Sequence, residues 1–173
     1  MADIRNRMLR AAKLEIHLYE EVEHDEGALA QATTVVVLSA VAAGIGSFRV
    51  GGLAGLAVGT IGALLGWYVW AFLTYYIGTR LLPEPQTHAD HSELLRTIGF
   101  ASAPGLIRVV GIIPGLEAIV FAVASVWMLV AMVIAVRQAL DYSSTWRAIG
   151  VCAIGWVVQV AVLGLVFAMF GVG

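Results

Sequence analysis

Histidine and carboxylate side chains at helical spacing are the residues of this sequence best suited to chemistry, because together they can bind a divalent metal such as zinc. His17, Glu21 and His24 are four and three residues apart, which places them on one face of a helix. His88 and His91 form a second group in a later polar segment. If the N-terminal segment folds back beneath the protein, the two groups could meet and form a metal site. The alternative is that all five lie on solvated surfaces, since nothing in the sequence forces them together.

Two opposite charges within apolar sequence form a second candidate site. Arg108 and Glu117 lie on either side of the turn Pro114-Gly115. A charge in an apolar membrane segment is costly, so it usually pairs with another charge or lines a wet cavity. We expect a membrane ion pair that fixes the turn, and the alternative is a site for a ligand or an ion.

Catalysis has little support in this sequence, and we predict no catalytic residues and no enzyme. The single cysteine, Cys152, lies in an apolar stretch, where we expect it to serve as a small packing residue. The histidines and the candidate hydroxyl nucleophiles fall on different elements, which argues against a Ser-His-Asp set. The net charge of −2 gives no footprint for nucleic acid.

Membrane-spanning helices must position these residues. The chain is 60% hydrophobic and only 13% charged, with a mean hydropathy of +0.89. A soluble domain of this length has too little interior to bury so much apolar surface. A helix needs about 20 mainly apolar residues to cross a bilayer. Five stretches approach or exceed this length, which predicts an all-α bundle of five transmembrane helices: Ala30–Phe48, Gly52–Leu82, Leu94–Ile113, Leu116–Val136 and Ala148–Val172.

The basic residues predict how the bundle is oriented. With five spans and a cytoplasmic N-terminus, Arg49 and Arg108 are the two basic residues on the outer side, and the other eight are on the cytoplasmic side. This is the asymmetry that the positive-inside rule describes. We therefore expect the N-terminus in the cytoplasm and the C-terminus outside.

Residues 1–26 predict an amphipathic helix that precedes the membrane domain, residues 27–173. Apolar residues recur in it every three or four positions, from Ile4 to Val22. Its basic residues could lie near anionic headgroups on the membrane surface. Alternatively, the helix packs against the cytoplasmic ends of the spans. Asp25 is then placed to cap the first spanning helix.

Glycine spacing marks one face of the second stretch. The glycines are three and four residues apart, which predicts a face along which another helix can approach closely. We favour packing within the chain over a dimer interface. The glycines of this face are Gly52, Gly55, Gly59, Gly62 and Gly66.

The third stretch is expected to be a broken helix. Ala103-Pro104-Gly105 interrupts it at its centre, and Pro114-Gly115 ends it. Before it, Pro83-Glu84-Pro85 ends the second span. Asp90 and Glu93 have the spacing of a capping box for the helix that follows.

Several segments resemble the bacterial Yip1-domain family of membrane proteins. They are the run from Leu18 to Asp25 followed by Gln31-Ala32, the run Ile98–Leu106, Trp127, and the runs Tyr142–Thr145 and Arg147-Ala148. The resemblance covers nearly the whole chain and implies five spans with a cytoplasmic N-terminus. In eukaryotes the family works in membrane traffic and contacts small GTPases of the Rab type. This sequence lacks the Asp-Leu-Tyr-Gly-Pro motif of those relatives.

Three functions are compatible with these features. The leading hypothesis is a non-enzymatic multi-pass scaffold that organises lipids or partners in the bacterial inner membrane, as a homo-oligomer or in a larger complex. The second is a transporter or channel subunit that uses the broken third span with Arg108 and Glu117, because broken helices often build substrate sites. The third is divalent metal binding at the cytoplasmic side by the two histidine groups. No cofactor is assured, and no nucleic-acid partner is expected.

Overall fold

The described chain folds entirely into helices joined by short connections. The computed structural model describes residues 3–170, and the side chains of residues 3–161. Within this part, η1 is a single π-helical turn and η2 is a 3₁₀ helix. The elements in chain order are α1 (Ile4–Ala12), α2 (Ile16–His24), α3 (Ala28–Gly46), α4 (Phe48–Tyr76), η1 (Ile77–Leu81), α5 (His91–Phe100), η2 (Ala103–Ile112), α6 (Glu117–Ala139) and α7 (Thr145–Phe170).

Four segments of the described chain are long and apolar enough to cross a membrane: Ala28–Gly46, Phe48–Leu81, His91–Ile112 and Glu117–Ala139. They agree with the first four predicted stretches to within four residues at each end. The fifth is the shorter apolar helix Thr145–Ala161, within α7. Its predicted end, Val172, lies outside the described residues. The protein is therefore a multi-pass helical membrane protein.

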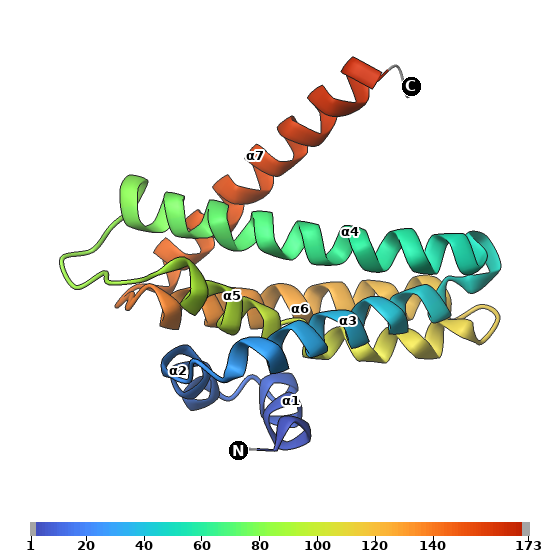
Figure 1. Cartoon of the computed structure of the whole chain (residues 1–173), viewed down its shortest axis with the longest axis horizontal. Helices are drawn as coiled ribbons and strands as arrows, with labels where there is room; N and C mark the ends of the chain where they lie inside the picture. Colours follow the sequence, from blue (N-terminus) through green and yellow to red (C-terminus); the bar gives the residue numbers. More distant parts are fainter. Residues whose placement is uncertain (1–2, 171–173) are drawn as a thin grey trace.

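The spanning helices alternate in direction and so define two ends of the bundle. At the hairpin end, α3 turns into α4 and η2 turns into α6; at the loop end, the segments 82–90 and 140–144 make the connections (Figure 1). α4 lies along one side of the layer formed by α3, α5 and α6 (Figure 1). α1 and α2, which we call the cap, lie on the other side of that layer. α7 starts at the loop end and leaves the bundle at a steep angle (Figure 1).

The cap is two helices rather than the single helix predicted for residues 1–26. α1 ends at Ala12, and Leu14 has a φ of 61°, a left-handed conformation that cannot continue a helix. The chain turns there, so that α2 packs back against α5 and α6. The turn lets both helices direct their apolar faces toward the spans.

The start of α3 also differs from the prediction. Gly27, not Asp25, is the N-cap residue. The Asp25 carboxylate accepts a hydrogen bond from the Gly27 amide at 2.9 Å and another from the Arg7 guanidinium at 2.7 Å. Asp25 therefore links the cap to α3 instead of capping it.

The predicted break in the third span is confirmed. The capping box of Asp90 and Glu93 starts α5, with reciprocal hydrogen bonds of 2.7 and 2.8 Å. α5 ends at Phe100, and the chain continues from Ala103 as a 3₁₀ helix with Pro104 in its first turn. Pro104 has no amide hydrogen to donate, so the α-helical ladder cannot continue through it.

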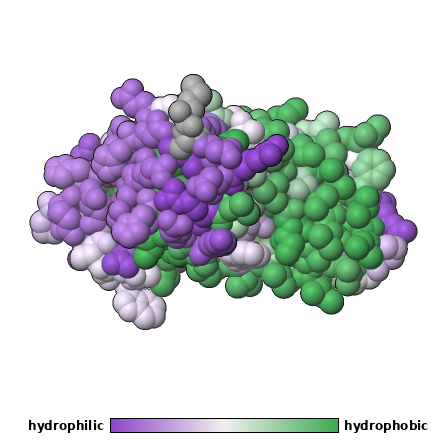
Figure 2. All heavy atoms as spheres, turned by 90° about the horizontal axis from the view of Figure 1, so that it is seen from below, coloured by the Kyte–Doolittle hydropathy of each residue, from purple (hydrophilic) through white to green (hydrophobic). Residues whose placement is uncertain are grey.

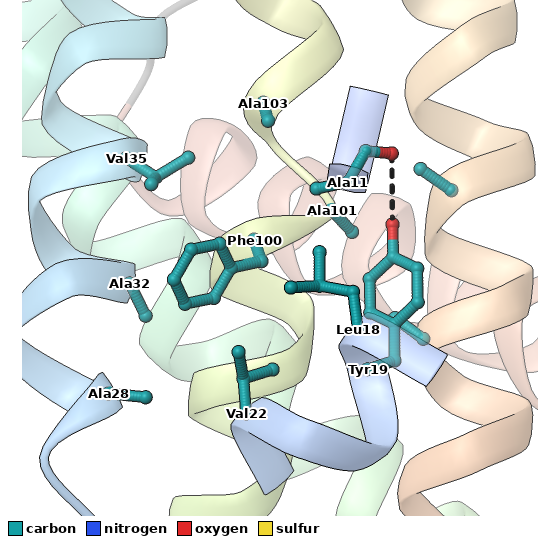
Figure 3. Packing of buried hydrophobic residues seen from close by; sticks show 12 residues of the cluster. Ala11, Leu18, Tyr19, Val22, Ala28, Ala32, Val35, Phe100, Ala101 and Ala103 are labelled. Carbon is teal, nitrogen blue, oxygen red and sulfur yellow. Dashed lines mark hydrogen bonds between the residues drawn. The ribbon is translucent and has the colours of Figure 1, made fainter. Parts of the chain in front are cut away.

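One apolar cluster joins the cap to the spans. Leu18, Tyr19 and Val22 of α2 are fully buried against Phe100 at the end of α5 (Figure 3). The Tyr19 hydroxyl donates to the carbonyl oxygen of Ala11 at 3.5 Å (Figure 3). Seen from the cap side, hydrophilic residues cover one part of the molecule and hydrophobic residues cover most of the remainder (Figure 2). The cap is thus an integral, polar-surfaced part of the fold.

Candidate functional site

Arg96 of α5 forms hydrogen bonds to the C-terminal end of α2. Arg96 is only 6% exposed, and its Nε donates to the carbonyl oxygens of Val22 and Glu23 at 3.0 Å each. Its Nη2 also donates to the Glu23 carbonyl. The last carbonyls of a helix have no partner within the helix and carry partial negative charge, so a buried guanidinium suits this position.

Trp127 of α6 forms a hydrogen bond to the C-terminal end of α1. Its indole Nε1 donates to the carbonyl oxygen of Ala12 at 2.8 Å. A further contact joins α6 to α2, where Gln138 Nε2 donates to Glu20 Oε1 at 2.8 Å. Both cap helices are therefore held, at their C-terminal ends, by side chains from different spanning segments.

Two arginines of the cap are bound within it. Arg7 donates from Nε to Glu21 Oε1 at 2.9 Å, and Arg10 donates from Nη1 to Glu21 Oε2 at 2.5 Å. The hydrogen bond from Arg10, together with that from Arg7, lowers the pKa of Glu21. The Arg7 hydrogen bond likewise lowers the pKa of Asp25. Arg7 is nearly buried, so the structure favours the packed cap over a helix that presents this residue to lipid headgroups.

Glu23 is a buried acid of the cap. Its burial raises the pKa to about 7, and the negative charges of Asp141 and Glu93 add to this effect. The carboxyl group therefore keeps its proton to a higher pH than an exposed glutamate does. The sequence pattern did not predict the burial of Glu23. This residue stands in a run of acidic residues next to His24, a composition typical of a solvated surface.

The structure does not assemble the predicted metal ligands. His17 contacts Glu20 at 3.2 Å, His24 hydrogen-bonds the Glu20 carbonyl at 2.9 Å, and Glu21 is held by the two arginines. His91 lies edge-on to the ring of Tyr68, with 4.8 Å between the ring centroids. In the described part of the chain, no three His, Cys, Asp or Glu residues are grouped closely enough to hold a metal ion. Metal binding, which would also involve His88, stays a prediction without geometric support.

Glu84 links the two connections at the loop end, a contact that the sequence did not predict. Its carboxylate, 6% exposed, accepts from the Ser143 amide at 2.9 Å and from the Ser143 hydroxyl at 2.7 Å, and pairs with Arg147 at 3.1 Å. The backbone and side-chain hydrogen bonds from Ser143 lower the pKa of Glu84. Because Glu84 and Ser143 belong to the two connections at the loop end, this contact ties them together.

The predicted ion pair between Arg108 and Glu117 is not formed. Arg108 instead donates from Nη2 to Ser125 Oγ at 3.2 Å, and its guanidinium lies 5.5 Å from the centre of the Phe121 ring. Ser125 lies eight residues after Glu117, about 12 Å further along α6. Arg108 therefore points into the bundle, whereas Glu117 stays in the first turn of α6, beside a separate shallow hollow.

The glycine face of α4 is not packed against another helix. A Cβ added at Gly55, Gly59, Gly62 or Gly66 would meet nothing within 4 Å in the structure. Gly52 has a φ of 56° and a non-helical conformation, so it bends the chain at the start of α4. The prediction of close packing within the chain along this face is therefore not met.

A groove takes the place of the expected helix contact. It has a volume of about 490 Å³ and lies between α4 and the layer of α3, α5 and α6, with α7 contributing Gln159. Gly55, Gly59 and Gly66 line its α4 side, and Arg108 lines it from η2. Several small polar side chains face it from other elements: Ser39, Ser47 and Ser102.

The comparison with protein families decides the identity of the fold. The family model described as Yip1 domain matches residues 18–167. This chain belongs to the Yip1 domain family. No curated protein and no solved structure matches it.

The Yip1 match begins in α2 and continues through all four candidate spans into α7, so α1 precedes it. The segments that suggested the family lie at junctions of the structure. Phe100 fills the cluster between cap and spans. The Tyr142 hydroxyl donates to the carbonyls of Gly78 and Leu82, at 3.0 and 2.8 Å, and so closes the loop end.

Proposed function

We propose that this Yip1 domain protein is a non-enzymatic scaffold of the bacterial inner membrane, in which five spanning helices hold a polar cap in a fixed position. The observation that carries the proposal is the attachment of both cap helices to the spans by Arg96 and Trp127. A scaffold must present a surface whose place relative to the membrane does not vary. Buried, hydrogen-bonded polar contacts supply that constancy, because breaking them leaves unsatisfied groups.

We propose that the cap lies on the cytoplasmic side, with the C-terminus outside, as the basic residues indicate. Cysteine labelling of intact cells with a membrane-impermeant maleimide tests this in a Cys152→Ser background. Leu116→Cys, an exposed position at the hairpin end, is expected to react. His88→Cys at the loop end is expected to react only after the cells are permeabilised. The opposite pattern would reverse the topology, and labelling of Gly173→Cys in intact cells tests the fifth crossing.

We also propose that copies of the protein assemble with one another. Two differently tagged copies are produced together and extracted gently from their membrane. Wild-type copies are expected to co-purify, and the double variant Arg96→Met, Trp127→Phe is expected to lose most of this association because its cap is loosened. Lys13→Ala is the matched control, since Lys13 is exposed on the same cap. Recovery of single copies from the wild type would contradict the proposal, as would unchanged association in the double variant.

Transport is a second candidate, favoured by the groove beside the broken third span. It predicts anion flux in proteoliposomes that falls in Arg108→Gln, because Arg108 lines the groove. Flux at the level of empty vesicles would remove this candidate.

A further inference from the structure

The groove beside α4 is space that the chain leaves unfilled at membrane depth. Its volume of about 490 Å³ lies within the range of ligand pockets in proteins. It extends along α4 from Gly55 to Trp70, a length of about 22 Å at 1.5 Å per residue. Its width comes from the absence of side chains, because a Cβ at Gly55, Gly59 or Gly66 would meet no atom within 4 Å.

A cation without a counter-charge lies near the hairpin end of this groove. Arg108 is half-buried within a segment apolar enough to span a membrane. Among the described residues, no carboxylate forms an ion pair with it, and its buried Nε has no hydrogen-bond partner. Its guanidinium donates to one serine hydroxyl and lies over one aromatic ring. An uncompensated charge at this depth is expensive, so an anion that neutralises it would bind favourably.

The two ends of the groove differ in chemistry. Ser47 and Arg108 both line the groove at the hairpin end, where the carbonyl of Arg108 comes close to Gly46. Toward the loop end the lining includes Trp67, Trp70 and Met132. A ligand that matches this gradient has an anionic head and an apolar chain.

We propose that the groove binds one acidic amphiphile, with its anionic headgroup on Arg108 and one acyl chain along the glycine face of α4. The headgroup accepts hydrogen bonds from the guanidinium. The chain fills the space beside Gly55 and Gly59. This site is separate from the cap and does not depend on the scaffold role.

The test reconstitutes the full chain in nanodiscs of phosphatidylcholine and adds one probe at a time: oleate, phosphatidylglycerol or the uncharged oleyl alcohol. Native mass spectrometry then measures the fraction of protein that keeps the probe. The wild type is expected to retain an acidic probe at least tenfold better than oleyl alcohol. Retention of oleate alone identifies a fatty acid as the ligand, whereas retention of phosphatidylglycerol identifies an anionic phospholipid.

Matched variants separate the groove from general effects of charge and bulk. Arg108→Gln is expected to lower retention at least tenfold, and Arg108→Lys to restore part of it. Arg49 is exposed and lies outside the groove, so Arg49→Gln is expected to leave retention unchanged. Gly59→Leu is expected to block the groove. Gly62→Leu, on the same helix but not lining the groove, is expected to retain the probe.

Three results would overturn the proposal. The first is equal retention of charged and uncharged probes by the wild type. The second is an equal loss in Arg108→Gln and Arg49→Gln, which would show attraction to surface charge only. The third is a dimer without bound probe that Gly59→Leu converts to monomers, which would show that a second copy occupies the groove. If Gly59→Leu fails to fold, the three arginine variants still decide the matter.

Discussion

Substitution of two glycines by alanine should have opposite effects on stability. At Gly46 the new Cβ would collide with the carbonyl oxygen of Arg108 and lie 3.0 Å from a carbon of the Phe121 ring. The colliding oxygen belongs to the backbone, so it cannot rotate away as a flexible side chain could. At Gly59 the new Cβ would meet nothing within 4 Å.

The magnitudes follow from two opposing terms. Overpacking of a fitted contact costs about 1–3 kcal/mol, and replacing a helical glycine by alanine gains up to about 1 kcal/mol. Because the collision is with the backbone, we take the overpacking cost of Gly46→Ala toward the upper end of this range. The free energy of unfolding should then fall by about 2 kcal/mol net. Gly59→Ala has no packing cost and should gain as much as about 1 kcal/mol.

The assay is reversible unfolding in mixed micelles, followed by far-ultraviolet circular dichroism as the fraction of denaturing detergent rises. Gly46→Ala should unfold at a lower detergent fraction than the wild type, and Gly59→Ala at the same or a higher one. Equal midpoints for the two variants would refute the close approach of η2 to the end of α3. A loss at Gly59 alone would refute the open glycine face.

Three further predictions concern the connections of the cap and the loops. Arg96→Met should speed hydrogen exchange of the α2 amides while exchange in α6 stays slow; unchanged α2 exchange would contradict the role of Arg96 in holding α2. The pKa of Glu23 is raised in the fold, so its neutral form is favoured there, and stability should fall as pH rises from about 5 to about 7. His24, whose pKa is raised by its hydrogen bond to the Glu20 carbonyl, adds a loss of the same sign as it deprotonates. Thermal melts across this range should show that the melting temperature of Glu23→Gln falls less steeply with pH than that of the wild type. An equally steep fall would contradict the raised pKa of Glu23. Glu84→Gln should speed exchange at both loop-end connections, with no change at the hairpin end; equal exchange everywhere would contradict the link through Glu84.

The spanning segments could be predicted because the bilayer constrains length and composition so strongly. The break at Pro104 and the capping box at Asp90 were also predictable, since both depend on local backbone chemistry. The turn at Leu14 was not, because the apolar period of residues 4–22 continues through it and the φ of 61° depends on tertiary packing.

The candidate sites were harder to predict than the fold. Arg108 and Glu117 are near in sequence, but the 3₁₀ helix directs the arginine inward, toward Ser125. The glycine spacing on α4 marked a real face, yet periodicity cannot tell whether a neighbouring helix fills the space beside it. Arg96 binds carbonyls some seventy residues earlier in the chain, a contact that no sequence spacing encodes.

The scaffold role is tested most directly by native mass spectrometry of the wild-type protein, released from its own membrane with the surrounding lipid. A self-associating scaffold should give a species that contains two or more copies of the chain. This species should be lost when Arg96→Met and Trp127→Phe are combined. A single copy as the only species from the wild type would contradict a self-associating scaffold.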